Sequence, residues 1–76
     1  MNPKLIIISP CYNEEAILQS SIDELKVVME QMVQDELIAP SSHLLLVDDG
    51  SKDKTWNIIS TNVNEGGVKG IKLAAN

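Results

Sequence analysis

Phenylalanine is absent from this sequence of 76 residues, and aromatic residues make up only 3% of it. The hydrophobic core must therefore be built from Ile, Leu, Val and Met. Basic residues are also few, with 6 Lys and Arg against 11 Asp and Glu, which gives a formal net charge of −5. Nucleic acids and anionic membranes are bound through basic surfaces, so neither is expected as a partner.

Cysteine occurs once, as Cys11, so no internal disulfide can form and the reducing cytoplasm is the simpler expectation. No histidine stands near Cys11 in the sequence to activate it, and we interpret it as a buried or half-buried thiol. Apolar runs such as Leu5–Ile8 are far shorter than the roughly 20 residues that span a bilayer. No signal peptide is visible either.

Three apolar runs alternate with two stretches in which apolar residues recur every three or four positions, the spacing of an amphipathic helix. The runs lack polar alternation, which is typical of parallel strands covered on both faces. The predicted order is a strand over Lys4–Ser9, a helix from Asn13 to about Leu37, a strand over His43–Val47, a helix from Asp53 or Lys54 to about Val63, and a strand over Gly70–Ala74.

Local signals define the ends of these elements. Pro10 is expected to end the first strand, because proline cannot donate to a sheet ladder. Asn13 is a good helix N-cap, with Glu14 and Glu15 in the first turn, where the helix dipole favours negative charge. In the second helix we expect Trp56, Ile59 and Val63 to lie on one side.

The β-α-β-α-β order implies parallel strands joined by right-handed crossovers, an α/β, Rossmann-like arrangement. Three strands covered by two helices leave apolar faces and an open sheet edge, which a complete domain would cover. We therefore expect residues 1–76 to be the amino-terminal, incomplete part of a longer domain.

Polar segments follow the first two predicted strands, Ser9–Glu15 after the first and Asp48–Thr55 after the second. In an open parallel sheet, ligands bind beyond the carboxyl ends of the strands, near the point where strand order reverses. The two segments are therefore expected to form one site.

These segments resemble the family 2 glycosyltransferases, whose domains open with a P-x-Y-N-E turn and continue to a V-D-D-G-S-x-D-x-T turn. Here the motifs stand as Pro10–Glu14 and Val47–Thr55, in order and each after an apolar strand. Within the family, the likeness is greatest to the polyprenyl-phosphate sugar transferases that resemble dolichol-phosphate mannosyltransferase. Those enzymes often have Arg-Asn after the third strand, where this chain has Ala75-Asn76.

The resemblance implies a GT-A fold and inverting transfer of a sugar from a nucleoside-diphosphate donor, with polyprenyl phosphate as an acceptor and Mg²⁺ or Mn²⁺ as cofactor. It implies a role in cell wall or glycolipid biosynthesis, in the cytoplasm or at the cytoplasmic face of a membrane. The implied nucleotide-sugar contacts are Pro10, Tyr12, Glu14, Val47 and Asp49, supported by Asn13, Asp48 and Gly50.

The chemistry of these residues fits a nucleoside. A phenol ring offers a face to the base, and a carboxylate accepts hydrogen bonds from a base N–H or a ribose hydroxyl. Carboxylates repel a diphosphate, so Asp49 and Glu14 should face the base or ribose, and phosphate contacts should run through a divalent metal.

Structural roles stay open for several residues. Tyr12 could be a core aromatic, Asn13 only a helix cap, and Asp48-Asp49-Gly50 only a turn whose Asp side chains accept backbone N–H groups. Gly50 is expected to take a backbone conformation that side chains forbid. Turn and N-cap roles are expected for Ser51 and Asp53, and a place in the first helical turn for Thr55. Trp56 is expected in the core, and His43 in a structural or exposed role.

The family's metal-binding D-x-D motif and its catalytic base are not found in this sequence, whose last aspartate is Asp53. We therefore assign no catalytic or metal-binding residue. The chain alone is expected to show no turnover and at most weak nucleotide affinity.

Rival nucleotide-binding folds fit less well. A dinucleotide-binding domain or a sugar nucleotidyltransferase needs a glycine-rich first turn, and Ser9–Glu15 contains no glycine. A response-regulator receiver carries its Asp pair after the first strand, whereas here the pair follows the second. The remaining alternative is a non-catalytic α/β module that self-associates through its exposed sheet edge.

Overall fold

A computed structural model describes residues 2–73 of the chain. Ala75-Asn76, where the chain departs from the Arg-Asn of the resembling enzymes, and the predicted end of the third strand at Ala74 lie outside the described residues. The elements are β1 (Ile6–Cys11), α1 (Leu18–Gln34), β2 (His43–Asp48), α2 (Thr55–Glu65) and β3 (Val68–Lys72).

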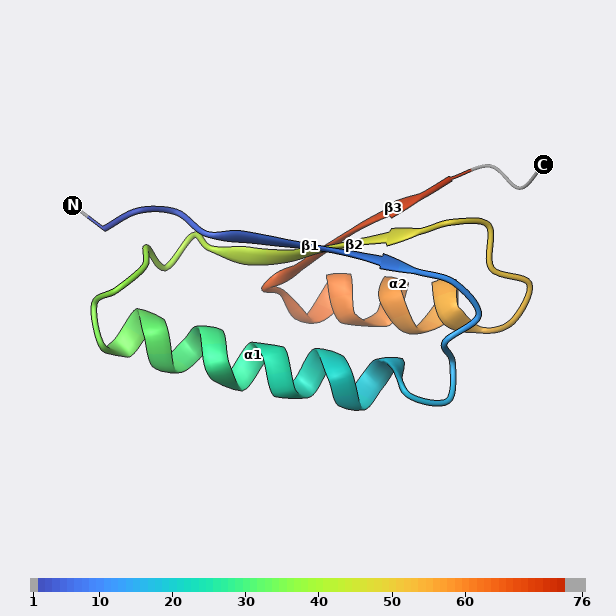
Figure 1. The fold of residues 1–76 in the computed structure, drawn as a ribbon, viewed down its shortest axis with the longest axis horizontal. Coiled ribbons are helices and arrows are strands. Elements are labelled where there is room, and N and C mark those ends of the chain that lie inside the picture. Colours follow the sequence, from blue (N-terminus) through green and yellow to red (C-terminus); the bar gives the residue numbers. More distant parts are fainter. Residues whose placement is uncertain (1, 74–76) are drawn as a thin grey trace.

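The three strands form one parallel sheet in the order β1-β2-β3, with β2 in the centre. Both helices lie on the same side of this sheet (Figure 1). Two successive crossovers that step in one direction across a sheet put their helices on one face when both are right-handed. The predicted β-α-β-α-β arrangement with parallel strands is therefore confirmed.

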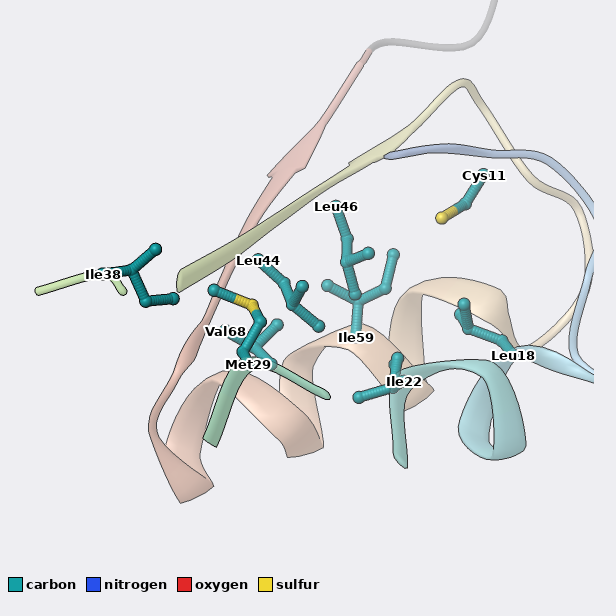
Figure 2. Packing of buried hydrophobic residues seen from close by; sticks show 9 residues of the cluster. All are labelled: Cys11, Leu18, Ile22, Met29, Ile38, Leu44, Leu46, Ile59 and Val68. Atoms are coloured by element: carbon teal, nitrogen blue, oxygen red, sulfur yellow. The ribbon is translucent and has the colours of Figure 1, made fainter. Parts of the chain in front are cut away.

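The core lies between the sheet and the two helices and contains no aromatic residue among its fully buried members. Leu44 and Leu46 of β2 point toward Ile59 of α2 and Ile22 of α1 (Figure 2). Close packing also requires Gly70 of β3, because a Cβ atom there would lie 2.5 Å from Cγ2 of Ile59. The prediction of a core made of Ile, Leu, Val and Met is confirmed, with Cys11 at its edge and Trp56 packed against it.

Within residues 2–73, no element covers the other face of the sheet. Residues of β1 alternate in exposure, and Ile8, with 64% of its surface exposed, points away from the helices. Ile6 and Ile71 are exposed on the same open face, and Leu45 and Val47 of β2 are half-buried between them. Residues of both parities along β1 and β2 are mostly apolar, so the uncovered face is apolar as well as the core face. This agrees with the expectation that two helices leave apolar surface of the sheet uncovered.

The predicted end of the first strand was wrong. Pro10 lies inside β1, where it is paired in register with Val47, and the strand continues to Cys11. Among the described strands β1 pairs only with β2, so it can contain a residue without an N–H group, as edge strands do.

The predicted start of the first helix was also wrong. α1 begins at Leu18, and its first turn contains no acidic residue. Asn13 has a positive φ of 49°, which helices do not use, and Glu14 forms a turn whose carbonyl oxygen accepts the N–H groups of Ile17 and Leu18. The helix ends at Gln34, near the predicted end.

In the second half of the chain, α2 and β3 differ from the prediction mainly at their ends. β3 begins at Val68 rather than Gly70, because the turn is completed by Gly66 and Gly67, both with positive φ. Val63 is exposed, and Asn62 lies against the core in the position that Val63 was expected to occupy.

Asn62 is 1% exposed and is held by a pair of amide hydrogen bonds to α1. Its Nδ2 donates to Oε1 of Gln19 at 2.8 Å, and Nε2 of Gln19 donates to its Oδ1 at 3.1 Å. Nδ2 also donates to the carbonyl oxygen of Ile58. The pair satisfies a polar group that would otherwise be costly to bury, and it fixes how the two helices lie against each other.

None of the helices described between residues 2 and 73 combines the length and apolar character needed to cross a membrane.

The amide pair generates a stability prediction. Asn62→Ala should lower the free energy of unfolding by about 1–3 kcal/mol, because it removes three hydrogen bonds and leaves the Gln19 amide without its partner. Urea unfolding followed by Trp56 fluorescence would measure the change. Asn64→Ala, at an exposed position of the same helix, is the matched control and should be within about 0.5 kcal/mol of wild type. Equal losses in both variants would contradict the prediction.

Candidate functional site

The two loops that follow β1 and β2 lie at the same end of the sheet, to the right in Figure 1. The first loop covers residues 12–17 and the second covers residues 49–54. Both contain the polar segments singled out in the sequence, so the prediction that parallel strands bring these segments together is confirmed.

Three consecutive backbone N–H groups of the first loop donate to side-chain oxygens of the second loop and of the first residue of α2. The bonds run from Asn13 N to Ser51 Oγ (2.9 Å), from Glu14 N to Thr55 Oγ1 (2.8 Å) and from Glu15 N to Asp53 Oδ2 (3.2 Å). We call this set of three bonds the loop clasp. It joins residues about 40 positions apart and fixes one loop on the other.

The second loop also donates a hydrogen bond to the first. Its Lys52 N–H donates to Oδ1 of Asn13 at 2.8 Å. Asn13 therefore binds the second loop through both its backbone and its side chain, and its predicted role as a helix cap was wrong. Gly50 has a φ of 76°, as predicted, which a side chain would disfavour in this turn.

Asp48 is fully buried on the helix side of β2, at 0% exposure. Its Oδ1 accepts the N–H of Ser51 at 3.0 Å, which is the turn role that the sequence left open for it. Its Oδ2 has no hydrogen-bond partner among the described residues.

Asp53 and Thr55 form the start of α2. Asp53 Oδ1 accepts both the N–H and the hydroxyl of Thr55. The hydrogen bond from the Thr55 hydroxyl is the main reason that the pKa of Asp53 is lowered, with further contributions from the backbone N–H groups of Thr55 and Glu15. Thr55 begins α2 as predicted, whereas the predicted N-cap role of Asp53 was wrong, because Lys54 holds that position and Asp53 lies in the turn before it. Asp53 Oδ2 and Thr55 Oγ1 also accept clasp bonds.

The five predicted nucleotide-sugar contacts all lie at this end of the sheet. Pro10 and Val47 are register partners near the carboxyl ends of their strands and lie on the open face. Tyr12 is 52% exposed, so it is not a core aromatic. Asp49 is exposed, and its N–H donates to the carbonyl oxygen of Cys11 at 2.9 Å, which extends the ladder one residue beyond β2.

Glu14 differs from the other four predicted contacts because its main chain takes part in the clasp. It is half-buried, and its carboxylate lies near enough to Cys11 to act on that thiol. The five residues thus lie at the same end of the sheet, and nucleotide binding by them stays a prediction.

Sequence reasoning missed the joint role of Ser51, Asp53 and Thr55. Each was interpreted as a local turn or helix-start residue, because their spacing is that of a helix entry. Only the pairing of β1 with β2 brings the first loop within reach of their oxygens.

Cys11 is a buried thiol, as predicted. Burial raises its pKa above the usual value, and the negative charges of Glu14 and Asp48 raise it further. The thiol is therefore protonated at neutral pH and poorly suited to act as a nucleophile.

A hollow with a volume of about 300 Å³ lies far from the clasp. It is lined by Met29 and Val33 of the second half of α1, together with Ser42 and Gly67, which precede β2 and β3. It therefore sits at the amino ends of the strands and is not the candidate site.

Over residues 2–73 there is no group of three or more His, Cys, Asp or Glu side chains placed to hold a metal ion. Asp48 and Asp49 are consecutive residues, but the first is buried on the helix side and the second is exposed. These residues do not fit a complete site for Mg²⁺ or Mn²⁺, which bind several oxygen ligands at once.

Comparisons with known proteins agree on one family. The sequence model described as Glycosyl transferase family 2 matches residues 6–76. The Uncharacterized glycosyltransferase YkoT of Bacillus subtilis (strain 168) is 43% identical over 75 residues, which cover 97% of this chain and 22% of that protein. The Dolichyl-phosphate beta-glucosyltransferase of Dictyostelium discoideum is 32% identical over 73 residues, which cover 95% of this chain and 22% of that protein. The chain thus spans about a fifth of the length of these relatives. No solved structure matches it.

The environment of Cys11 predicts low reactivity. Because the raised pKa leaves little thiolate and the sulfur is buried, Cys11 in the native chain should react at least about tenfold more slowly with a thiol reagent at pH 8 than in the unfolded chain. The rate of reaction with a chromogenic disulfide, with and without guanidinium, measures this ratio. Equal rates would contradict the prediction.

The lowered pKa of Asp53 predicts a pH-dependent contribution to stability. A carboxylate with a lowered pKa stabilises the fold above its unfolded-state pKa of about 4, and this contribution is lost as the pH falls through the lower folded-state value. Asp53→Asn should therefore be less stable than wild type at pH 7, and the difference should shrink below about pH 4. Urea midpoints at several pH values measure it, and a difference that does not change with pH would count against the prediction.

Proposed function

The chain belongs to glycosyl transferase family 2, and from this premise we propose that it forms the nucleotide-sugar-binding part of an inverting glycosyltransferase. Glycosyl transfer is supported by the family and by the names of both relatives. We propose that residues 1–76 are the amino-terminal part of the transferase domain, and that the donor is a nucleoside-diphosphate sugar.

One observation carries this proposal. The clasp uses the backbone N–H groups of the first loop, while the side chains of Tyr12 and Asp49 stay exposed beyond the ends of neighbouring strands. An aromatic ring and a carboxylate at this place suit a base and a ribose, through stacking and through hydrogen bonds that the carboxylate accepts. Pro10 and Val47 would form the apolar floor, and Glu14 a second acceptor.

The phosphates of the donor need positive charge or N–H donors from elsewhere. In glycine-rich dinucleotide sites, loop N–H groups bind the pyrophosphate, but here Asn13, Glu14 and Glu15 donate within the protein. Asp49 and Glu14 would repel a diphosphate. We therefore propose that the nucleoside end lies against this chain, and that Mg²⁺ or Mn²⁺ neutralises the diphosphate with ligands that these residues do not supply.

We propose a polyprenyl phosphate as the acceptor of the whole protein, within cell wall or glycolipid biosynthesis at the cytoplasmic face of a membrane. Support comes from the name of the Dictyostelium relative, a dolichyl-phosphate glucosyltransferase. In an inverting displacement, a base deprotonates the acceptor while the nucleoside diphosphate leaves. No residue described here is assigned as that base, so the chain on its own should bind without transferring sugar.

Nucleotide titration tests the proposal. The chain should bind uridine or guanosine diphosphate with a Kd on the order of 0.1–1 mM, measured by calorimetry or by NMR shifts of the two loops. Tyr12→Ala should weaken binding by about 1–3 kcal/mol, since it removes the ring on which the base stacks, and Tyr12→Phe should keep most of the affinity. Asp49→Asn should also weaken binding.

Glu30→Gln is the matched control for Asp49→Asn, because Glu30 lies at the hollow on the far end of the sheet. It should bind as wild type does. If no nucleoside diphosphate shifts the loop resonances and light scattering shows a stable oligomer, the alternative of a self-associating α/β module is favoured instead. Sugar transfer from a labelled donor by the chain alone would contradict the expected lack of turnover.

A further inference from the structure

We propose that Thr55 is a positioning residue for the nucleoside diphosphate: its buried hydroxyl fixes the main chain of Glu14, and so holds Tyr12 in place beside Asp49. This inference rests on the proposed function, since it assigns to Thr55 a part in that same site. Thr55 itself would not touch the ligand, because it is 0% exposed.

Both hydrogen-bonding capacities of the Thr55 hydroxyl are used. It accepts the N–H of Glu14 at 2.8 Å and donates its own hydrogen to Oδ1 of Asp53. The same Oδ1 accepts the N–H of Thr55 at 2.9 Å, and Oδ2 accepts the N–H of Glu15. A hydroxyl that donates to a carboxylate is a stronger acceptor, and at 2.8 Å this bond is the shortest of the three clasp bonds.

The main chain of Glu14 links the starts of the two helices through hydrogen bonds. Its N–H is held by the first residue of α2, while its carbonyl oxygen accepts the N–H groups of Ile17 and Leu18 at 3.1 and 2.9 Å, at the entry of α1. α2 is anchored to the sheet through Ile59, which is fully buried against β2 (Figure 2). Thr55 therefore transmits the position of this anchored helix to the first loop.

Tyr12 lies between two fixed points. On one side Cys11 is paired with Asp48 at the end of the sheet, and on the other side Glu14 is held by Thr55. With both ends fixed, the loop presents the exposed ring in a narrow range of positions. Without the Thr55 bond, the Glu14 N–H loses its partner, and the loop must be ordered again when the nucleotide binds, which lowers affinity.

Two substitutions at position 55 separate the hydroxyl from the shape of the side chain. Thr55→Val keeps the branched shape and removes the hydroxyl, whereas Thr55→Ser keeps the hydroxyl. We expect Thr55→Val to weaken the binding of the diphosphate that wild type binds by about tenfold, which corresponds to one lost hydrogen bond of about 1.4 kcal/mol. Thr55→Ser should stay within about threefold of wild type.

A purely structural role is tested with Asn62→Ala, which weakens the contact between α1 and α2 without touching the clasp. Affinities are compared at a temperature at which urea titration shows every variant to be folded. If Thr55 acts only on stability, Thr55→Val and Asn62→Ala will both bind as wild type does. Weaker binding by Thr55→Val alone, with rescue by Thr55→Ser, supports the proposal.

Amide hydrogen exchange in the ligand-free chain gives a readout that does not need the nucleotide. Thr55→Val should speed exchange of the Glu14 and Glu15 amides by about tenfold, and leave the amides of β2 unchanged. Unchanged exchange at Glu14 overturns the positioning role. If wild type binds neither diphosphate, the proposed function fails, and with it the role of Thr55 toward a nucleotide, while faster exchange would still show that Thr55 orders the loop.

Discussion

The structure depends on the loop clasp, in which three consecutive N–H groups of the first loop donate to Ser51, Thr55 and Asp53. Neither loop has regular structure of its own, so its backbone groups need partners from outside. Each loop supplies what the other lacks. The first offers N–H donors, and the second offers side-chain oxygens held by the start of α2. The two loops are thus joined at this end of the sheet without a glycine-rich turn.

This constraint also determines what the site can bind. Loop N–H groups at the carboxyl end of a parallel sheet commonly bind phosphate, and here they donate to the protein itself. The predicted contacts at this end of the sheet are the ring of Tyr12, the carboxylates of Glu14 and Asp49, and the apolar side chains of Pro10 and Val47. These side chains are the support for the proposal that the nucleoside end of a donor lies against this chain.

The two faces of the sheet differ in how much packing they contribute to stability. The helix side contains the buried core and the amide pair of Gln19 and Asn62, whereas the other side leaves Ile6, Ile8 and Ile71 exposed within residues 2–73. A chain of 76 residues buries a smaller share of its surface on folding than a larger domain does, so each buried polar contact has a large effect on its stability. For this reason the few hydrogen bonds of the clasp and of the amide pair have a large effect on the stability of the chain.

The sequence by itself determined the element order, the parallel sheet, the aliphatic core and the end of the sheet at which the polar segments meet, because apolar periodicity and short-range turn residues are local properties. It was wrong about Pro10 and about the cap role of Asn13, and it could not reveal the clasp. Those features depend on which residues lie opposite each other across about 40 positions of chain. Only the pairing of β1 with β2 decided that Asn13 would meet Ser51 rather than cap α1, since a backbone N–H takes the acceptor that tertiary packing brings within 3 Å.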